Sequence, residues 1–123
     1  MSDCSIYLAG PFHERVPLLQ GWRADLLRRG YTVTSRWIDE RDEDADEAAT
    51  SAVRDVQDLE MADCLILHNG VARRDTRGGN HFEMGAAWAL GKRVIVVGVV
   101  GNVFHMLPEV EIFSTWPECL EGL

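Results

Sequence analysis

The sequence is poor in positive charge. Its 123 residues include 12 Lys and Arg against 20 Asp and Glu, which gives a formal net charge of -8. Proteins that bind polynucleotides do so mainly by neutralising phosphates with Lys and Arg, so this balance argues against DNA or RNA as a partner. The charge balance leaves open a small ligand in a local pocket.

Cysteine is scarce, and long apolar runs are missing. The three cysteines, Cys4, Cys64 and Cys119, are far apart and form no CxxC pair of the kind that indicates zinc or thiol redox chemistry. No apolar run approaches the roughly 20 residues needed to cross a bilayer, and no basic and apolar leader opens the chain. We therefore expect a soluble, cytoplasmic protein without a membrane partner, folded as a single domain over residues 1–123.

Signatures of cofactor and metal binding are also absent. There is no GxGxxG or Walker loop. The four histidines have no HxxxH or HxH spacing, which argues against a dedicated metal site. The acidic run at residues 39–47 lacks the glycine and the closing glutamate of a calcium loop, so we predict a solvated loop there. We expect neither a metal nor a cofactor.

The apolar segments that are present follow a regular order. Strand-like runs alternate with helical patterns, and such alternation builds a parallel sheet with helices on both faces. We predict an α/β, flavodoxin-like open parallel sheet of about five strands in the order 2-1-3-4-5, with ligands binding after strands one, three and four. The strands are expected at residues 5–9, 31–37, 64–68, 93–100 and 110–113, and the helices at 14–29, 48–61, 80–90 and 116–120.

The helix at residues 48–61 carries apolar residues on one face and two aspartates off that face. Asp58 is expected on a solvated helix surface. Asp55, three residues before Asp58, also lies off the apolar face, and the sequence alone leaves its role undecided. The apolar face consists of Ala49, Ala52, Val53, Val56 and Leu59.

The first expected strand ends at Gly10, Pro11 and Phe12. A glycine lets the backbone approach a ligand closely, and a proline fixes the direction of the chain as it leaves the strand. The same three residues would also suit an ordinary strand-to-helix turn.

One carboxylate, Glu83, follows a glycine pair at the start of the third expected helix. Asn80 and Glu83 have the spacing of a capping box, and spacing alone favours this structural interpretation. The helix N-terminus would also favour the ionised carboxylate, which could then attack an electron-poor carbon. His81 lies in the same turn and could contact a ligand, or could equally be a core or surface residue.

Three blocks of the sequence resemble the nucleoside 2-deoxyribosyltransferase family and its N-glycoside hydrolase relatives. The first block is residues 6–11, and the second is Asp55 followed by Ala62 and Asp63. The third and most specific block is residues 79–92, which contains Glu83. The segment 102–108 looks like that of small phage and bacterial members of this group.

The resemblance implies a flavodoxin-like fold and cleavage of a base–deoxyribose bond. It assigns Glu83 as the nucleophile that attacks C1′ and forms a glycosyl ester, Tyr7 as the residue that orients this carboxylate, and Asp55 as a proton donor or hydrogen-bond partner of the base. The sugar would then pass to a second base or to water. Substrate contacts are expected from Gly10, Pro11, Phe12, Gly79, His81 and Arg77.

The sequence departs from the family pattern just before Glu83. Transferases of this family usually carry another aspartate there, at a position that falls here near Thr76 and Arg77, with Asp75 displaced by about two residues. The arginines of this segment could bind a 5′-phosphate bidentately, or they could face water. We expect a deoxyribosyltransferase; the alternatives are a hydrolase of deoxynucleoside 5′-monophosphates and a non-catalytic nucleotide-binding module. Family members commonly form homodimers or larger homo-oligomers in which a neighbour completes the site.

Overall fold

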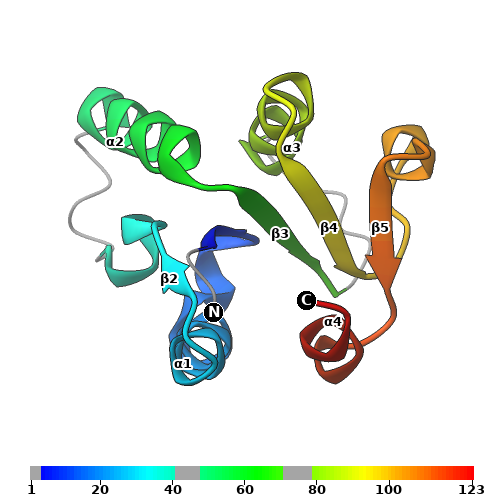
Figure 1. The fold of residues 1–123 in the computed structure, drawn as a ribbon. Helices are drawn as coiled ribbons and strands as arrows, with labels where there is room; N and C mark the ends of the chain where they lie inside the picture. Colours follow the sequence, from blue (N-terminus) through cyan, green and yellow to red (C-terminus); the bar gives the residue numbers. More distant parts are fainter. Residues whose placement is uncertain (1–3, 41–47, 71–78) are drawn as a thin grey trace.

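The computed structural model describes residues 4–40, 48–70 and 79–123 (Figure 1). The acidic segment 41–47 and the segment 71–78, which includes Arg77, lie outside the described residues. The solvated loop predicted for the acidic segment and the substrate contact predicted for Arg77 therefore stay predictions.

The sheet has five strands in the order β2-β1-β3-β4-β5, and each pair of neighbours is parallel. This is the predicted flavodoxin-like order. The order places β1 next to β3, so the strand ends at which ligands bind in such sheets lie side by side. The strands are β1 (Ser5–Ala9), β2 (Thr32–Val33), β3 (Cys64–Asn69), β4 (Arg93–Gly98) and β5 (Val110–Phe113).

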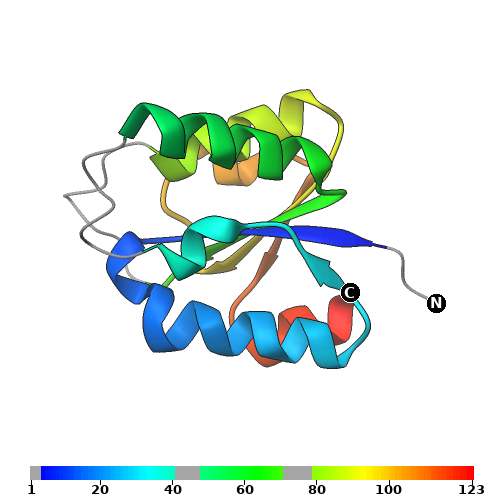
Figure 2. The ribbon, with the colours of Figure 1, turned by 90° about the vertical axis from the view of Figure 1, so that its left-hand side faces the viewer.

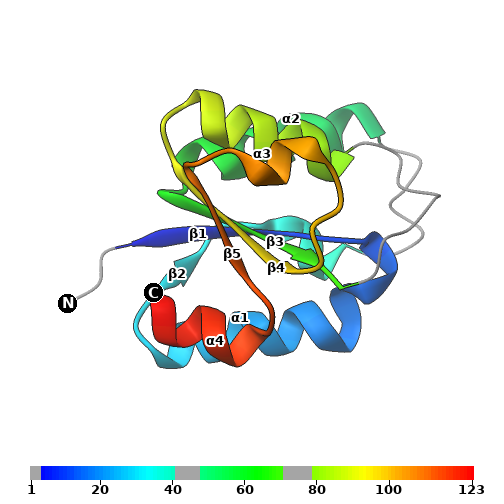
Figure 3. The ribbon, with the colours of Figure 1, turned by 90° about the vertical axis from the view of Figure 1, so that its right-hand side faces the viewer.

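Helices cover both faces of the sheet, as predicted. Figures 2 and 3 show α2 and α3 on one face and α1 and α4 on the other. In the part of the chain that the structure describes, no helix is long and apolar enough to cross a membrane. The helices are α1 (Gln20–Arg28), α2 (Ala48–Met61), α3 (Gly79–Ala89) and α4 (Trp116–Gly122), with shorter helical segments η1 (Phe12–Glu14), η2 (Arg15–Leu19), η3 (Arg36–Asp39) and η5 (Val103–Met106).

The strand β2 is much shorter than predicted. It ends at Val33, and the chain then turns into η3. Beyond that point two side chains take over the hydrogen bonds that a longer β2 would have made to β1. The backbone N–H of Leu8 donates to Ser35 Oγ at 3.1 Å, and Trp37 Nε1 donates to the Leu8 carbonyl at 2.8 Å. The buried backbone of Leu8 is therefore satisfied on the edge of β1 that lies beyond the end of β2.

The helix predicted at residues 14–29 is regular only from Gln20 onward. Val16 has extended backbone angles, and the peptide bond between Val16 and Pro17 is cis. Proline disfavours helical angles in the residue before it, so the chain cannot form a continuous helix through this point.

The helix α2 is oriented differently from the prediction. Val53 and Val56, which belong to the predicted apolar face, are 59% and 39% exposed, whereas Asp58 is only 2% exposed. The expectation of a solvated Asp58 was wrong, because Arg36 satisfies this carboxylate: Arg36 N donates to Oδ2 at 3.0 Å and Arg36 Nε to Oδ1 at 2.9 Å. Only Leu59, near the end of the predicted apolar face, is buried.

We predict that Asp58→Ala lowers the free energy of unfolding by about 2 kcal/mol, because it removes a buried carboxylate that accepts hydrogen bonds from the backbone N–H and the guanidinium of Arg36. Chemical denaturation at pH 7 measures this change. Glu60→Ala, on an exposed position of the same helix, should stay within about 0.5 kcal/mol of the parent protein. Equal effects of the two substitutions would show that the contact between α2 and η3 contributes no specific stability.

Candidate active site

The two residues expected to form the catalytic pair are in direct contact. Tyr7, in the middle of β1, donates its hydroxyl proton to Glu83 Oε2 at 2.5 Å. Tyr7 is fully buried, and this burial together with the adjacent Glu83 raises the pKa of its phenol far above the ordinary range. The phenol therefore stays protonated and acts as a permanent hydrogen-bond donor to the carboxylate.

Glu83 is a carboxylate in a largely desolvated place. Burial raises the pKa of Glu83 to about 7, and the charge of Asp55 adds to this, while the hydrogen bond from Tyr7 acts in the opposite direction. Ionised and protonated forms are therefore both well populated near neutral pH. The expectation that the helix N-terminus keeps Glu83 ionised is not met, because Glu83 is the fifth residue of α3 and the helix dipole weakens beyond the first turn.

The capping-box interpretation also fails. The helix α3 begins at Gly79, so Asn80 lies within the helix rather than before it. The carboxylate of Glu83 is bonded to Tyr7 on the neighbouring strand. Glu83 therefore faces the sheet.

Asp55, on α2, is the third member of the site. It is half-buried, and burial raises its pKa, an effect that Arg54 counteracts and that Glu40 and Asp58 reinforce. The charge of Asp55 in turn raises the pKa of Glu83 and that of Tyr7. Three groups, from β1, α2 and α3, thus act on one another electrostatically. Two of them, Asp55 and Glu83, are carboxylates in different environments, an arrangement that suits a pair in which one group is ionised and the other protonated.

The turn after β1 serves packing in the described residues. Gly10 is buried, and a Cβ atom there would lie 3.2 Å from Leu19 Cδ1 and 3.3 Å from His68 Cβ, which leaves little room for a side chain. Pro11 is half-buried and leads into η1. The ring of Phe12 stacks on Trp37 with centroids 6.4 Å apart. The structure thus gives Gly10 and Phe12 packing roles; ligand contact by this turn stays a prediction.

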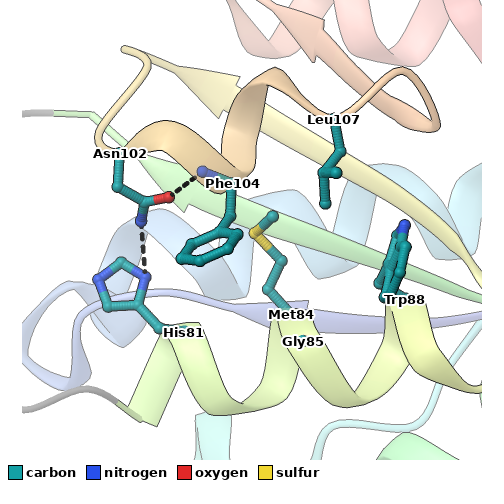
Figure 4. A pocket seen from close by; sticks show the side chains of 7 residues that line it. All are labelled: His81, Met84, Gly85, Trp88, Asn102, Phe104 and Leu107. Atoms are coloured by element: carbon teal, nitrogen blue, oxygen red, sulfur yellow. Dashed lines mark hydrogen bonds between the residues drawn. The ribbon is translucent and has the colours of Figure 1, made fainter.

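The remaining predicted contacts, Gly79 and His81, lie exposed at the start of α3. His81 lines a cavity of about 370 Å³ between α3 and η5 (Figure 4), and Glu83 is not among the residues that line it. Asn102 Nδ2 donates to His81 Nδ1 at 3.2 Å at one end of this cavity. The other lining residues are Met84, Gly85, Trp88, Phe104 and Leu107.

Metal ligands and reactive thiols do not gather at the site. Across the described ranges, no group of three or more His, Cys, Asp or Glu side chains could hold a metal ion. The three cysteines are free, and burial raises the pKa of Cys64 to about 12 and that of Cys119 to about 11. Both thiols are therefore protonated and unreactive at neutral pH.

Sequence reasoning missed one pair beside the site, Glu40 and Arg54. Arg54 Nη2 lies 3.2 Å from Glu40 Oε2 and 3.4 Å from Asp55 Oδ1. Arg54 directly precedes Asp55 in the sequence, and this adjacency could have indicated a charged partner for Asp55. Glu40 lies 14 residues before Arg54, and only the tertiary fold brings the two together.

Comparison with solved structures finds close matches in fold. A 2-deoxyribosyltransferase from Bacillus psychrosaccharolyticus is 24% identical, with a TM-score of 0.70 over 94% of this chain and 89% of that protein. A CMP N-glycosidase from Clostridium botulinum is 19% identical, with a TM-score of 0.63 over 96% of each chain. A conserved protein from Enterococcus faecalis V583 is 16% identical, with a TM-score of 0.67 over 98% of this chain and 96% of that one.

Comparison with curated proteins gives no match. The model of the family described as nucleoside 2-deoxyribosyltransferase matches residues 6–111, which include β1, α2 and α3 with the three residues Tyr7, Asp55 and Glu83. This chain belongs to the nucleoside 2-deoxyribosyltransferase family.

Proposed function

We propose that the protein cleaves the N-glycosidic bond of a (deoxy)nucleoside through a covalent glycosyl-Glu83 intermediate and passes the sugar to another nucleobase. The observation that carries this proposal is the hydrogen bond between the fully buried Tyr7 and the partly buried Glu83. A desolvated carboxylate with one oxygen held in place is suited to attack a carbon that develops positive charge. The family match supports the same class of chemistry.

In the first step, an oxygen of the Glu83 carboxylate attacks C1′ of the sugar. The bond between C1′ and the base nitrogen breaks, its electron pair goes to the base, and Asp55 supplies the proton that the departing base takes up. Tyr7 binds Oε2, which orients the other carboxylate oxygen toward C1′. The product is a glycosyl ester on Glu83.

In the second step, the nitrogen of an incoming base attacks C1′ of the ester, and Glu83 leaves as a carboxylate. The proton lost by the incoming base returns to Asp55. Two displacements at C1′ retain its configuration. The cycle thus needs Glu83 ionised and Asp55 protonated at its start. Mutual repulsion of the two carboxylates favours one proton shared between them.

The nearest alternative is hydrolysis of deoxynucleoside 5′-monophosphates, in which water accepts the sugar. The structural similarity to a CMP N-glycosidase supports this alternative, as does the arginine-containing segment before α3, including Arg77. A third candidate is a nucleotide-binding module without catalysis. The identity of the acceptor distinguishes the three.

We also propose that the chain works in the cytoplasm as a homodimer or larger homo-oligomer. Val53 and Val56 of α2 and Phe82 and Trp88 of α3 are 39–63% exposed, on the helices that cover one face of the sheet (Figure 2). Exposed apolar surface of this kind commonly marks a protein contact. Light scattering after gel filtration should give at least the dimer mass, and a monomer at micromolar concentration would contradict this proposal.

We predict that Glu83→Gln abolishes turnover and leaves the protein folded. The assay supplies a deoxynucleoside with a second free base, and separately deoxynucleoside monophosphates, and resolves the products by chromatography. Exchanged nucleoside from the parent protein identifies the transferase, and free base from monophosphates alone identifies the hydrolase. Glu60→Gln makes the same chemical change on an exposed position and should keep full activity. Retained activity in Glu83→Gln would remove Glu83 as the nucleophile.

The same substitution has a predicted effect on stability. Because the pKa of Glu83 is raised to about 7 in the folded protein, folding is disfavoured once the carboxylate ionises, so the stability of the parent protein falls as pH rises from about 4.5 to 7. Glu83→Gln removes this penalty. Its free energy of unfolding should match that of the parent at pH 4 and exceed it at pH 8, by at most about 3 kcal/mol.

For Asp55→Asn we expect a change in the shape of the pH profile. Without an acid to protonate the leaving base, kcat/KM should fall by about 10² to 10⁴. The remaining activity then depends on one ionisation, so it should rise with pH through a pKa near or slightly below 7 and stay level above it. A bell-shaped profile in this variant would assign the proton donor to another residue.

A further inference from the structure

Arg54 lies between two carboxylates at the edge of the site. Its Nη2 atom is 3.2 Å from Glu40 Oε2 and 3.4 Å from Asp55 Oδ1. The side chain of Glu40 is only 10% exposed, and those of Arg54 and Asp55 are each 27% exposed. Burying three charged side chains together costs several kcal/mol of folding free energy unless they are well paired. We therefore ask what this cluster contributes to the site.

Glu40 is fixed by bonds from three segments of the chain. Ser51 Oγ donates to Glu40 Oε1 at 2.9 Å, and Arg15 Nε donates to the Glu40 carbonyl at 2.7 Å. The backbone N–H of Glu40 donates to the carbonyl of Trp37 at 3.0 Å. Glu40 is therefore held in place, and its ion pair with Arg54 restricts the long and otherwise flexible Arg54 side chain.

We propose that Arg54, held in place by Glu40, is a positioning residue that orients Asp55 for proton transfer to the nucleobase. This inference rests on the proposed function. The contact at Oδ1 fixes the rotation of the Asp55 carboxyl group and leaves Oδ2 to carry the proton. The side chain of Arg54 acts through Asp55, without touching the substrate.

Arg54 and Glu40 also influence the pKa of Asp55 through their charges. Arg54 lowers the pKa of Asp55, whereas Glu40 and Asp58 raise it. Asp55 itself acts on Glu83 across the site. The charge of Asp55 also raises the pKa of Tyr7 and that of Arg36. Neither Arg54 nor Glu40 is among the groups that shift the pKa of Glu83, so substitutions of this pair act mainly on Asp55.

The pH optimum of kcat/KM tests this inference. A reaction that needs one group ionised and one protonated has its optimum midway between the two pKa values, whichever is higher. Arg54→Gln removes the cation and raises the pKa of Asp55, so the optimum should move to higher pH. Glu40→Gln removes the opposing anion and should move the optimum to lower pH. A purely structural role predicts lower activity with an unchanged optimum.

Two further variants serve as controls. Arg54→Lys keeps the positive charge and should return the optimum to near the parent value, whereas Arg54→Gln should lower kcat at pH 7 by up to about 100-fold through misplacement of Asp55. Arg93→Gln breaks a comparable ion pair, since Arg93 Nε lies 2.6 Å from Glu111 Oε2. Arg93 opens β4 and is not among the groups that shift the pKa of Asp55 or Glu83, so its loss should leave the optimum unchanged.

Shifts of the pH optimum in opposite directions for Arg54→Gln and Glu40→Gln support the inference, and an unchanged optimum in both variants overturns it. If circular dichroism shows that Arg54→Gln does not fold, Glu40→Gln is tested alone: an optimum at lower pH supports the inference, and an unchanged optimum overturns it. Failure of the proposed function gives a different result. In that case the parent protein transfers no sugar between bases, or Glu83→Gln retains activity, whereas failure of this inference alone leaves transfer dependent on Glu83 and the optimum unmoved.

Discussion

The hydrogen bond between Tyr7 and Glu83 is the interaction on which the site depends. It joins residues 76 positions apart and connects β1 to the helix that carries the proposed nucleophile. A tyrosine in the middle of a fully buried strand needs a partner for its hydroxyl group, and a buried carboxylate needs a donor. Each residue therefore satisfies the other. The remaining cost is that of ionising Glu83, as its raised pKa indicates.

The structure around this bond holds both partners in fixed positions. On one side, beyond the end of the short β2, the side chains of Ser35 and Trp37 form hydrogen bonds with the backbone of Leu8, the residue next to Tyr7. On the other side, α2 turns polar groups inward: Asp58 binds Arg36, and Asp55 contacts Arg54 beside the site. The same rotation of α2 leaves valines on its outer surface. Catalytic placement and an exposed apolar face are thus two consequences of one helix orientation.

The sequence was sufficient to predict the sheet order, because strands and helices alternate and the two central strands are continuously apolar. The resemblance to a family also predicted that Tyr7 lies beside Glu83, as the hydrogen bond between them shows, whereas the catalytic roles of Tyr7, Asp55 and Glu83 stay predictions. The sequence did not predict the burial of Asp58 or the short β2, since both depend on side chains of η3 that reach across from outside the regular elements. The capping interpretation of Glu83 failed for a similar reason, because spacing along one helix carries no information about a donor on a neighbouring strand. Glu40 was missed because no local pattern connects it with Arg54.

The central claim is that Glu83 becomes covalently bonded to the sugar. Rapid acid quenching of the protein during turnover of a deoxynucleoside, followed by peptide mass spectrometry, tests this directly. The account predicts one added deoxyribosyl group on the peptide that contains Glu83, present in the parent protein and absent from Glu83→Gln. Rapid turnover without any adduct, together with inverted configuration at C1′, would contradict it, because a direct attack of the acceptor on the nucleoside would then replace the two-step path.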